Sequence, residues 1–309
     1  RSSDLNERKV NFMNYTILTD SCCDLPIEYL ESNDIRYISL TYRLGDKEFY
    51  DNFGQDLEYK KFYDFMREGK LPKTSQVNPQ SYYEMFKEIL DQGKDILYVC
   101  VSSGLSGTYN SANIAKDMIM DEEKYRNRKI EIIDVLTASL GQGLMVIKAV
   151  DMKCNGFTLE ENSKALEKMK FNLNTYMSVN DLDYLKKGGR ISNAAAFVGK
   201  LLNIKPLLTL DNEGKVIPIL KIKGKKALLK KLAEIISKKM KNTSEEIVCI
   251  SHGDSIEEAE KLKDSILKNT EVKEVIISNI GPAVGTYGGP GALAIFFIGE
   301  HRQNHIIDI

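Results

Sequence analysis

In the segment Val99-Cys100-Val101-Ser102-Ser103-Gly104-Leu105-Ser106-Gly107-Thr108-Tyr109-Asn110-Ser111-Ala112, an apolar run gives way to small hydroxyl residues and two glycines. The apolar run begins at Ile96 and is short enough for a buried parallel strand. A helical pattern resumes at Thr108 and continues to about Met120. A strand that enters a helix through such a turn leaves backbone N–H groups and hydroxyls at the positive end of the helix. The turn therefore suits a carboxylate or a phosphate, although serines that merely cap the helix would look the same.

The size and charge of the chain narrow its class. Its 309 residues are more than one typical core needs, so two domains are expected. The 43 basic and 44 acidic residues give a net charge of −1, which argues against a nucleic-acid partner. The longest apolar runs, such as residues 292–298, are far too short to span a bilayer, and the polar start resembles no signal peptide. We therefore expect a soluble, cytoplasmic protein.

Neither the cysteines nor the histidines indicate a metal or cofactor site. The five cysteines are odd in number and none are spaced as C-x-x-C. Cys100 and Cys249 fall in predicted core strands, where a thiol behaves as a small hydrophobic group. His252, His301 and His305 lack a partner at metal-ligand spacing. We expect no metal and no cofactor.

The first half of the chain alternates predicted strands with predicted helices. Strands are expected over residues 15–19, 35–42, 95–101 and 129–135. The second of these could turn at Gly45-Asp46 and extend to about Asp51. Asp56 is expected to cap a helix over residues 57–67, and residues 72–77 are expected to form a loop. The alternation predicts a parallel sheet covered on both faces, in an N-terminal α/β domain of residues 13–171.

From residue 172 the pattern changes. Residues 206–210 and 216–222 flank Asp211-Asn212-Glu213-Gly214, which predicts a β-hairpin. An apolar helix rich in small residues is expected over residues 193–202, and a basic helix with a solvated face over residues 225–241. A glycine-rich loop, residues 281–291, leads into a last strand over residues 293–299. These elements predict a second α/β domain of residues 172–309.

Three loops of small polar residues are candidates for a binding site: Thr74-Ser75-Gln76, residues 102–108 and residues 281–291. Asp20 and Ser21 lie where the first strand ends, which is the edge where open parallel sheets bind ligands. Ser21 and Asp24 could equally be ordinary helix caps. The loops together predict a site that binds an anionic group through neutral donors.

Two catalytic motifs are absent from these loops. A G-x-S-x-G nucleophile elbow around Ser106 would need glycine at position 108, where the chain has threonine. The histidines supply no plausible base for such a serine. No G-x-x-x-x-G-K-[ST] sequence occurs, so a P-loop for nucleotide is also absent. A serine hydrolase and a P-loop enzyme are therefore disfavoured.

Five motifs together carry a resemblance to a known family. They are T-D-S-x-x-D-L-P from Thr19, T-S-Q from Thr74, S-S-G-L-S-G-T-Y-x-S-A from Ser102, L-K-K-G-G-R-I-S from Leu185 and G-P-x-x-G from Gly281. In this order and combination they resemble the DegV family of bacterial fatty-acid-binding proteins. The resemblance covers nearly everything from residue 15 to residue 299. One such motif would be weak, but the set is specific.

The resemblance implies an α/β protein with the DegV-type fold, in which two α/β domains enclose a ligand cavity at their interface. The N-terminal domain would carry the carboxylate-binding loops and the C-terminal domain would cover the acyl chain. Transferred to this sequence, the family's carboxylate site falls on Thr74 with Ser75, on Ser103 or Ser102, and on Tyr287. The supporting loops would contribute Asp20, Ser21, Ser106, Gly107 and Thr108.

Tyr287 stands where the family has a histidine. Tyrosine donates one hydrogen bond but carries no positive charge at neutral pH. The headgroup contact could therefore be weaker, bridged by water, or rebuilt with another donor. The ligand implied by the resemblance is a fatty acid of about C14–C18, with most of its affinity coming from the buried chain.

The resemblance also implies a partner and a role. Members of the family bind the acid and present it to a separate ATP-dependent fatty acid kinase, which forms an acyl-phosphate for phospholipid synthesis. The chain would then be a lipid-delivery subunit and not itself an enzyme. A transient contact of the protein with a membrane remains an alternative. Arg190, expected to be exposed, is the candidate contact with the kinase, although a solvated basic turn is the plainer interpretation. An autonomous small-molecule kinase or transferase related to dihydroxyacetone kinase and a lipid-sensing regulatory protein remain alternatives.

Overall fold

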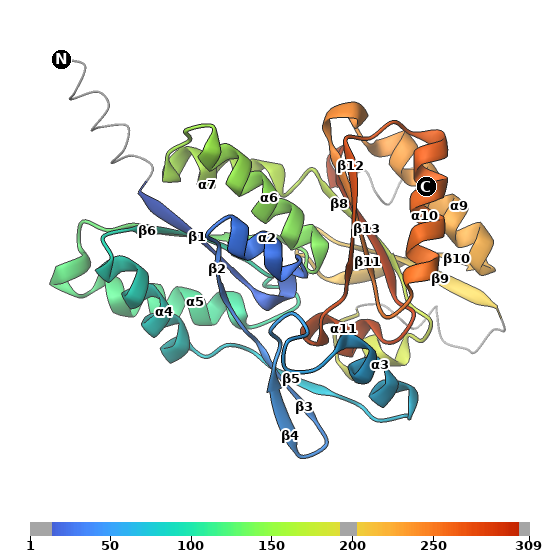
Figure 1. Ribbon diagram of the computed structural model, residues 1–309, viewed down its shortest axis with the longest axis horizontal. Coiled ribbons are helices and arrows are strands. Elements are labelled where there is room, and N and C mark those ends of the chain that lie inside the picture. Colours follow the sequence, from blue (N-terminus) through green and yellow to red (C-terminus); the bar gives the residue numbers. More distant parts are fainter. Residues whose placement is uncertain (1–13, 192–202, 303–309) are drawn as a thin grey trace.

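A computed structural model describes residues 14–191 and 203–302. The helix expected over residues 193–202 lies outside the described residues. Strands of the described part form three sheets, of four, six and three strands. The first two sheets lie side by side with helices around them, and the third is a small ribbon below them (Figure 1).

The first sheet has the strand order β2-β1-β6-β7, and its pairs are all parallel. Its strands are β1 Tyr15–Asp20, β2 Arg36–Ile38, β6 Asp95–Cys100 and β7 Ile130–Asp134. The accompanying helices are η1 Ser21–Cys23, α2 Ile27–Ser32, α4 Pro79–Asp91, α5 Thr108–Met120, η2 Glu123–Tyr125, α6 Leu140–Cys154 and α7 Leu159–Met169. Along β6, Tyr98 joins the apolar cluster of α4 and α5, while Leu97 and Val99 join that of α6 and α7. The predicted parallel sheet with helices on both faces is therefore confirmed.

The second sheet has the order β10-β9-β8-β13-β11-β12 and is antiparallel except for the pair of β11 with β12. Its strands are β8 Leu173–Ser178, β9 Ile204–Leu210, β10 Val216–Lys223, β11 Ile247–His252, β12 Glu274–Asn279 and β13 Leu293–Ile298. Its helices are α8 Asp183–Lys187, α9 Lys225–Lys239, η4 Thr243–Glu245, α10 Ile256–Asn269 and α11 Pro282–Gly288. α9 and α10 cover the outer face of this sheet (Figure 1). The predicted hairpin is confirmed as β9 and β10.

The third sheet was not expected from the sequence. The second strand ends at Ile38 instead of Tyr42, and the chain then forms a hairpin of β3 Thr41–Leu44 and β4 Lys47–Tyr50, which turns at the predicted Gly45-Asp46. The predicted loop contains β5 Lys73–Ser75, which pairs with β3 and places Thr74 opposite Tyr42. These strands are only three or four residues long, too short to show a period.

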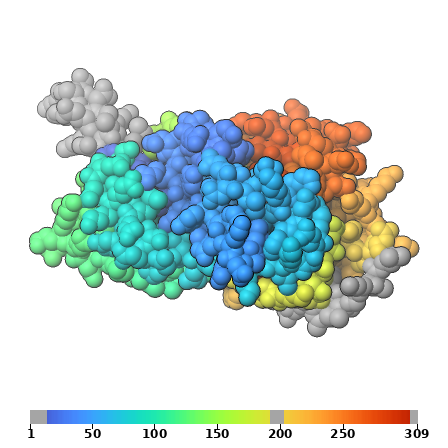
Figure 2. Space-filling model, turned by 60° about the horizontal axis from the view of Figure 1, so that its bottom comes forward, coloured from blue at the N-terminus to red at the C-terminus, as the bar shows by residue number. Residues whose placement is uncertain are grey.

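α3, Tyr59–Arg67, packs on this ribbon through Phe62, Tyr63 and Met66. The helix begins two residues later than expected, and Glu58 rather than Asp56 is at its N-cap position, without a side-chain cap. The hydroxyl of Tyr63 donates to the carbonyl of Ile280 at 2.8 Å, which ties the ribbon to the second sheet. In Figure 2 the blue surface of this ribbon spreads over the centre of the molecule, beside the yellow segment of α8.

α6 lies between the first two sheets and joins them. Its residues from Leu140 to Ile147 are all buried. A Cβ at Gly141 would lie 2.6 Å from a ring carbon of Phe296 in β13, and a Cβ at Gly143 would lie 2.7 Å from the carbonyl oxygen of Cys23. Only glycine fits both contacts, so the two sheets share one continuous core. The boundary between residues 171 and 172 stays a prediction, because α6 packs against strands on both sides of it.

Two buried carboxyl groups hold the start of α11, a helix where the sequence predicted a glycine-rich loop. The backbone N–H of Gly281 donates to Asp24 and that of Ala283 donates to Asp51, each at 2.8 Å. These bonds satisfy N–H groups that a helix leaves free at its first turn, and Pro282 at the first helical position needs none. Asp24 therefore serves α11 across the molecule rather than capping a helix close to it in the sequence.

The same two carboxyl groups make the stability of the fold depend on pH. Burial raises the pKa of Asp51 from 3.8 to about 7. Burial, with the charge of Asp51 next, holds the pKa of Asp24 well above its usual range. In both groups the protonated form is favoured by folding. The stability that these two groups contribute is therefore fully present below their pKa in the unfolded chain, near 4. It is lost as the pH rises through the pKa of Asp51 in the folded protein, about 7.

We expect the free energy of unfolding to fall by about 2 kcal/mol or more between about pH 5 and about pH 8. Asp51→Asn keeps an acceptor for the Ala283 N–H but cannot ionise. The free energy of unfolding of this variant is therefore expected to fall less over the same pH range. Urea unfolding of both proteins at the two pH values measures the difference. Parallel pH profiles would contradict this assignment.

Candidate ligand-binding cavity

A cavity of about 260 Å³ lies between the first and second sheets. Most of its wall is apolar, and the carboxyl end of β6, the inner face of β8 and β13, and the helices α8 and α11 supply it. Representative apolar wall residues are Val101, Leu185, Met177, Leu210 and Phe296. Along β8, Thr175 and Met177 face the cavity, whereas Tyr176 between them packs into the cluster of α9 and α10. The wall therefore suits a long apolar ligand.

One end of the cavity is polar. The hydroxyls of Thr74 on β5 and Tyr287 on α11 lie 2.6 Å apart. The guanidinium carbon of Arg190 is 4.6 Å from the centre of the Tyr287 ring. Ser106 and Gly107 complete this end. The structure thus brings five of the predicted residues together, from four separate segments of the chain.

Arg190 is held in place by the loops it joins. Its Nε donates to the carbonyl of Leu105 at 3.1 Å, and its Nη1 donates to the carbonyl of Gly188. The side chain is half-buried, so the expectation of an exposed arginine is wrong. It is the single charged side chain among the described residues that line the cavity. A positive charge at this place would suit an anionic group.

In the turn between β6 and α5, Ser106 lines the cavity, whereas Ser102 and Ser103 do not. Ser102 is buried, donates to the carbonyl of Gly214 at 3.1 Å and accepts from Gly104 at 3.1 Å. Ser103 is exposed, and its N–H donates to Asp134. Neither of the two, nor the exposed Ser75, lies among the cavity-lining residues. Their part in headgroup binding stays a prediction.

Gly107 lies against the side chain of Gln76, which would have to move to admit a larger residue. A Cβ there would lie 1.9 Å from the amide oxygen of Gln76. The amide nitrogen of Gln76 donates to Ser111 on α5 at 3.2 Å, which fixes the chain just after β5 against α5. The turn and the ribbon thus meet beside Thr74.

The remaining predicted residues support the loops and do not line the cavity. Asp20 is completely buried and accepts from Tyr98, Cys22 and Val101 at 2.8–3.1 Å. Burial raises the pKa of its carboxyl group. The hydroxyl of Ser21 accepts from Leu40, and that of Thr108 accepts from Ser106. These bonds hold the ends of β1 and β6 in position.

Sequence reasoning missed polar residues on the inner wall. Thr137 and Ser139 follow β7, and Thr175 lies on β8. Ser139 has a φ of 57° and donates to Asp24 at 2.5 Å. The rule that ligands bind at the carboxyl ends of parallel strands, which pointed to Asp20, could have pointed to Thr137 and Ser139. No sequence signal marks Thr175.

Residues 14–191 and 203–302 contain neither a metal-binding cluster nor a membrane-spanning helix. No group of three or more His, Cys, Asp or Glu side chains there could hold a metal ion. No helix in that part of the chain combines the length and the apolar character needed to cross a membrane. His252 is buried, its Nδ1 accepts from the N–H of Ser255 at 3.1 Å, and burial lowers its pKa.

Comparison with known proteins identifies the family. A family model described as the DegV family of uncharacterised proteins matches residues 14–300. A DegV domain-containing protein of Clostridium perfringens is 41% identical over 289 residues, covering 94% of this chain and 99% of that protein. A DegV lipid binding protein from Thermotoga maritima has a crystal structure with a TM-score of 0.82 and 31% identity, covering 93% of this chain and 99% of that one.

The crystal structure of DegV, described as a fatty acid binding protein from Bacillus subtilis, is also similar. It has a TM-score of 0.77 and 31% identity, and covers 93% of this chain and all of that one. The matches run through both large sheets and both sides of the cavity. The chain belongs to the DegV family.

Proposed function

We propose that the cavity binds a long-chain fatty acid, with the carboxylate at the end formed by Thr74, Tyr287 and Arg190. The observation that carries the proposal is an apolar cavity with one charged side chain, which lies over Tyr287 beside Thr74. The relatives described as lipid or fatty acid binding proteins support it. The acyl chain supplies most of the affinity, at about 0.8 kcal/mol for each buried methylene before the cost of association.

The polar end offers the carboxylate several donors. Thr74 and Tyr287 form a hydrogen bond with each other in which only one hydroxyl donates. A carboxylate between them would accept from both, and charge-assisted bonds of this kind are strong. Arg190 supplies the positive charge that Tyr287 lacks. Ser106, rather than the exposed Ser103, is the serine on the cavity wall.

We further propose that the bound acid is presented to a separate ATP-dependent fatty acid kinase. Thr74, Arg190 and Tyr287 are half-buried, whereas much of the apolar wall is fully buried. The carboxylate end is therefore the end that a partner could reach from outside. The resemblance of the five motifs supplies the identity of the partner.

Protein purified from cells is expected to carry a fatty acid of about C14–C18, because a buried apolar cavity retains such chains. Mass spectrometry of an organic extract measures the ligand. A clean extract, together with no binding of added palmitate or oleate by native mass spectrometry, would sink the proposal.

Removal of single hydroxyls is expected to show which of them holds the carboxylate. Thr74→Ala and Ser106→Ala should each weaken binding by about 1–3 kcal/mol, since each leaves a carboxylate oxygen short of a donor. Ser75→Ala and Ser103→Ala lie on the same two loops and test the residues that the sequence predicted; since neither lines the cavity, we expect both variants to bind like the parent. Binding of a fluorescent fatty acid measures all four. Loss in Ser103→Ala without loss in Ser106→Ala would move the headgroup to Ser103.

Arg190→Gln is expected to weaken fatty-acid binding about tenfold, because the carboxylate loses its one positive partner. Lys187→Gln, an exposed charge in the same turn, is the control and should leave binding unchanged. Acyl-phosphate formation with ATP and a cognate kinase is measured on the same samples. Full binding with reduced turnover in Arg190→Gln would return this residue to the partner surface that the sequence predicted.

A further inference from the structure

A second polar feature lies at the start of α9. It shares Ser178 and Leu293 with the wall of the cavity, whereas its charged residues do not line the cavity. Successive residues of a strand face opposite sides, so Ser178 shares the face of Tyr176, toward α9. Ser178 is only 3% exposed, and its hydroxyl has no hydrogen-bond partner within residues 14–191 and 203–302. A buried hydroxyl without a partner is costly, so this one calls for an explanation.

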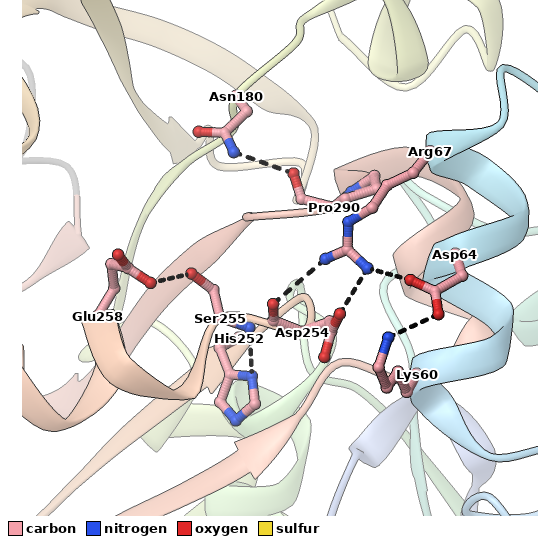
Figure 3. Close-up of polar contacts among 9 residues, drawn as sticks. All are labelled: Lys60, Asp64, Arg67, Asn180, His252, Asp254, Ser255, Glu258 and Pro290. Carbon is pink, nitrogen blue, oxygen red and sulfur yellow. Dashed lines mark hydrogen bonds and ion pairs between the residues drawn. The ribbon is translucent and has the colours of Figure 1, made fainter.

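Ser178 lines a small pocket of about 10 Å³ at the start of α9. This volume is close to that of one water molecule or one ligand oxygen atom. The polar residues around it are Asn180, Lys205, Lys225 and Glu258. Figure 3 shows two of them, Asn180 near Pro290 and Glu258 near Ser255.

Two lysines meet at this pocket with only one carboxylate between them. Lys225 pairs with Glu258 at 2.7 Å, and Glu258 also accepts from the hydroxyl of Ser255. The ammonium group of Lys205 donates to Asn180, a neutral amide, at 2.8 Å. Burial, and after it the charge of Lys225, lowers the pKa of Lys205. An anion at the mouth of the pocket would relieve this repulsion.

The first turn of α9 adds to the positive potential. Gly224 occupies the N-cap position with a φ of 87°, no side chain caps the helix, and no acidic residue lies in its first turn. A helix of 15 residues has a positive N-terminal end, where acidic side chains are usually favoured. Here the chain places Lys225 and Lys226 instead. Free backbone N–H groups at such an end are a typical phosphate site.

We propose that this pocket binds a phosphate group, with one oxygen reaching the hydroxyl of Ser178 and the others contacting Lys205, Lys225 and the first turn of α9. The site goes beyond the proposed function, because its charged residues Lys205, Lys225 and Glu258 do not line the fatty-acid cavity, with which it shares Ser178 and Leu293. A soluble phosphate monoester and the headgroup of phosphatidic acid, which is also a phosphate monoester, carry the same chemistry.

Inorganic phosphate is the first probe. At constant ionic strength it should raise the melting temperature of the full chain more than chloride does, because a ligand that binds the folded state stabilises it. Lys205→Gln is expected to weaken phosphate binding about tenfold and Ser178→Ala by a smaller factor. Lys238→Gln, an exposed lysine in the last turn of α9, is the matched control and should bind phosphate like the parent.

Three outcomes would overturn the site. Phosphate could stabilise the parent no more than chloride. Lys205→Gln and Lys238→Gln could lose the same amount of phosphate affinity, which would show a general effect of positive charge and no specific site. Ser178→Ala could keep the full phosphate affinity and become more stable without phosphate, which would show a pocket that holds water. Fatty-acid binding by Lys205→Gln should stay unchanged in every case, so this test is independent of the cavity.

Two further arms distinguish the sources of the phosphate group. Sedimentation with vesicles that contain phosphatidic acid, against vesicles of phosphatidylcholine alone, tests the lipid headgroup. A selective loss in Lys205→Gln, with displacement by inorganic phosphate, would support the site with a lipid as its ligand. A soluble ligand would be supported by two results together. Lys205→Gln and Lys238→Gln would sediment equally with the vesicles, and Lys205→Gln alone would lose binding of glycerol 3-phosphate.

Discussion

The burial of α6 between two sheets is the constraint on which the rest of the structure depends. A helix can lie this close to β13 on one side and to the segment after β1 on the other only where its facing residues lack side chains, and Gly141 and Gly143 meet that need. The helix begins at Ser139, on the wall of the cavity. The space for an apolar ligand therefore exists because α6 holds the sheets in contact along its own length and leaves a gap beyond its first residue.

The polar end of the cavity depends on a different set of buried contacts. Asp24 and Asp51 hold the first turn of α11, and Tyr287 lies near the end of that helix. The ribbon that carries Thr74 is tied to the same region by the bond from Tyr63 to Ile280. At its other side, Arg67 of α3 pairs with Asp254 at 2.6 Å, in the loop after β11 (Figure 3). Thr74 and Tyr287 thus meet because two separate segments are fastened to one place on the second sheet.

Long elements with a clear period could be predicted from the sequence, and short or composite ones could not. The parallel sheet, its covering helices and the β9–β10 hairpin follow from apolar runs and turn residues. The ribbon of β3, β4 and β5 is stabilised by packing on α3, which no local pattern reveals. The sequence of α11 predicts a loop because three of its seven residues are glycine or proline. The helix forms because its start is held by carboxyl groups more than 200 positions earlier in the chain. The motifs located Thr74 and Tyr287, whereas the choice among Ser102, Ser103 and Ser106 depends on side-chain direction in one turn.

The position of charge bears on the proposed carboxylate site, where the resemblance of the sequence implies a histidine in place of Tyr287. A histidine at the headgroup would be charged or neutral according to pH, whereas a guanidinium group stays charged across the physiological range. Arg190 lies over the Tyr287 ring, and its Nε and Nη1 are fixed by the carbonyls of Leu105 and Gly188. The ring makes a cation–π contact with the guanidinium group, and its hydroxyl lies beside Thr74 at the same end of the cavity. The tyrosine and the arginine together provide the donor and the charge that one protonated histidine would combine.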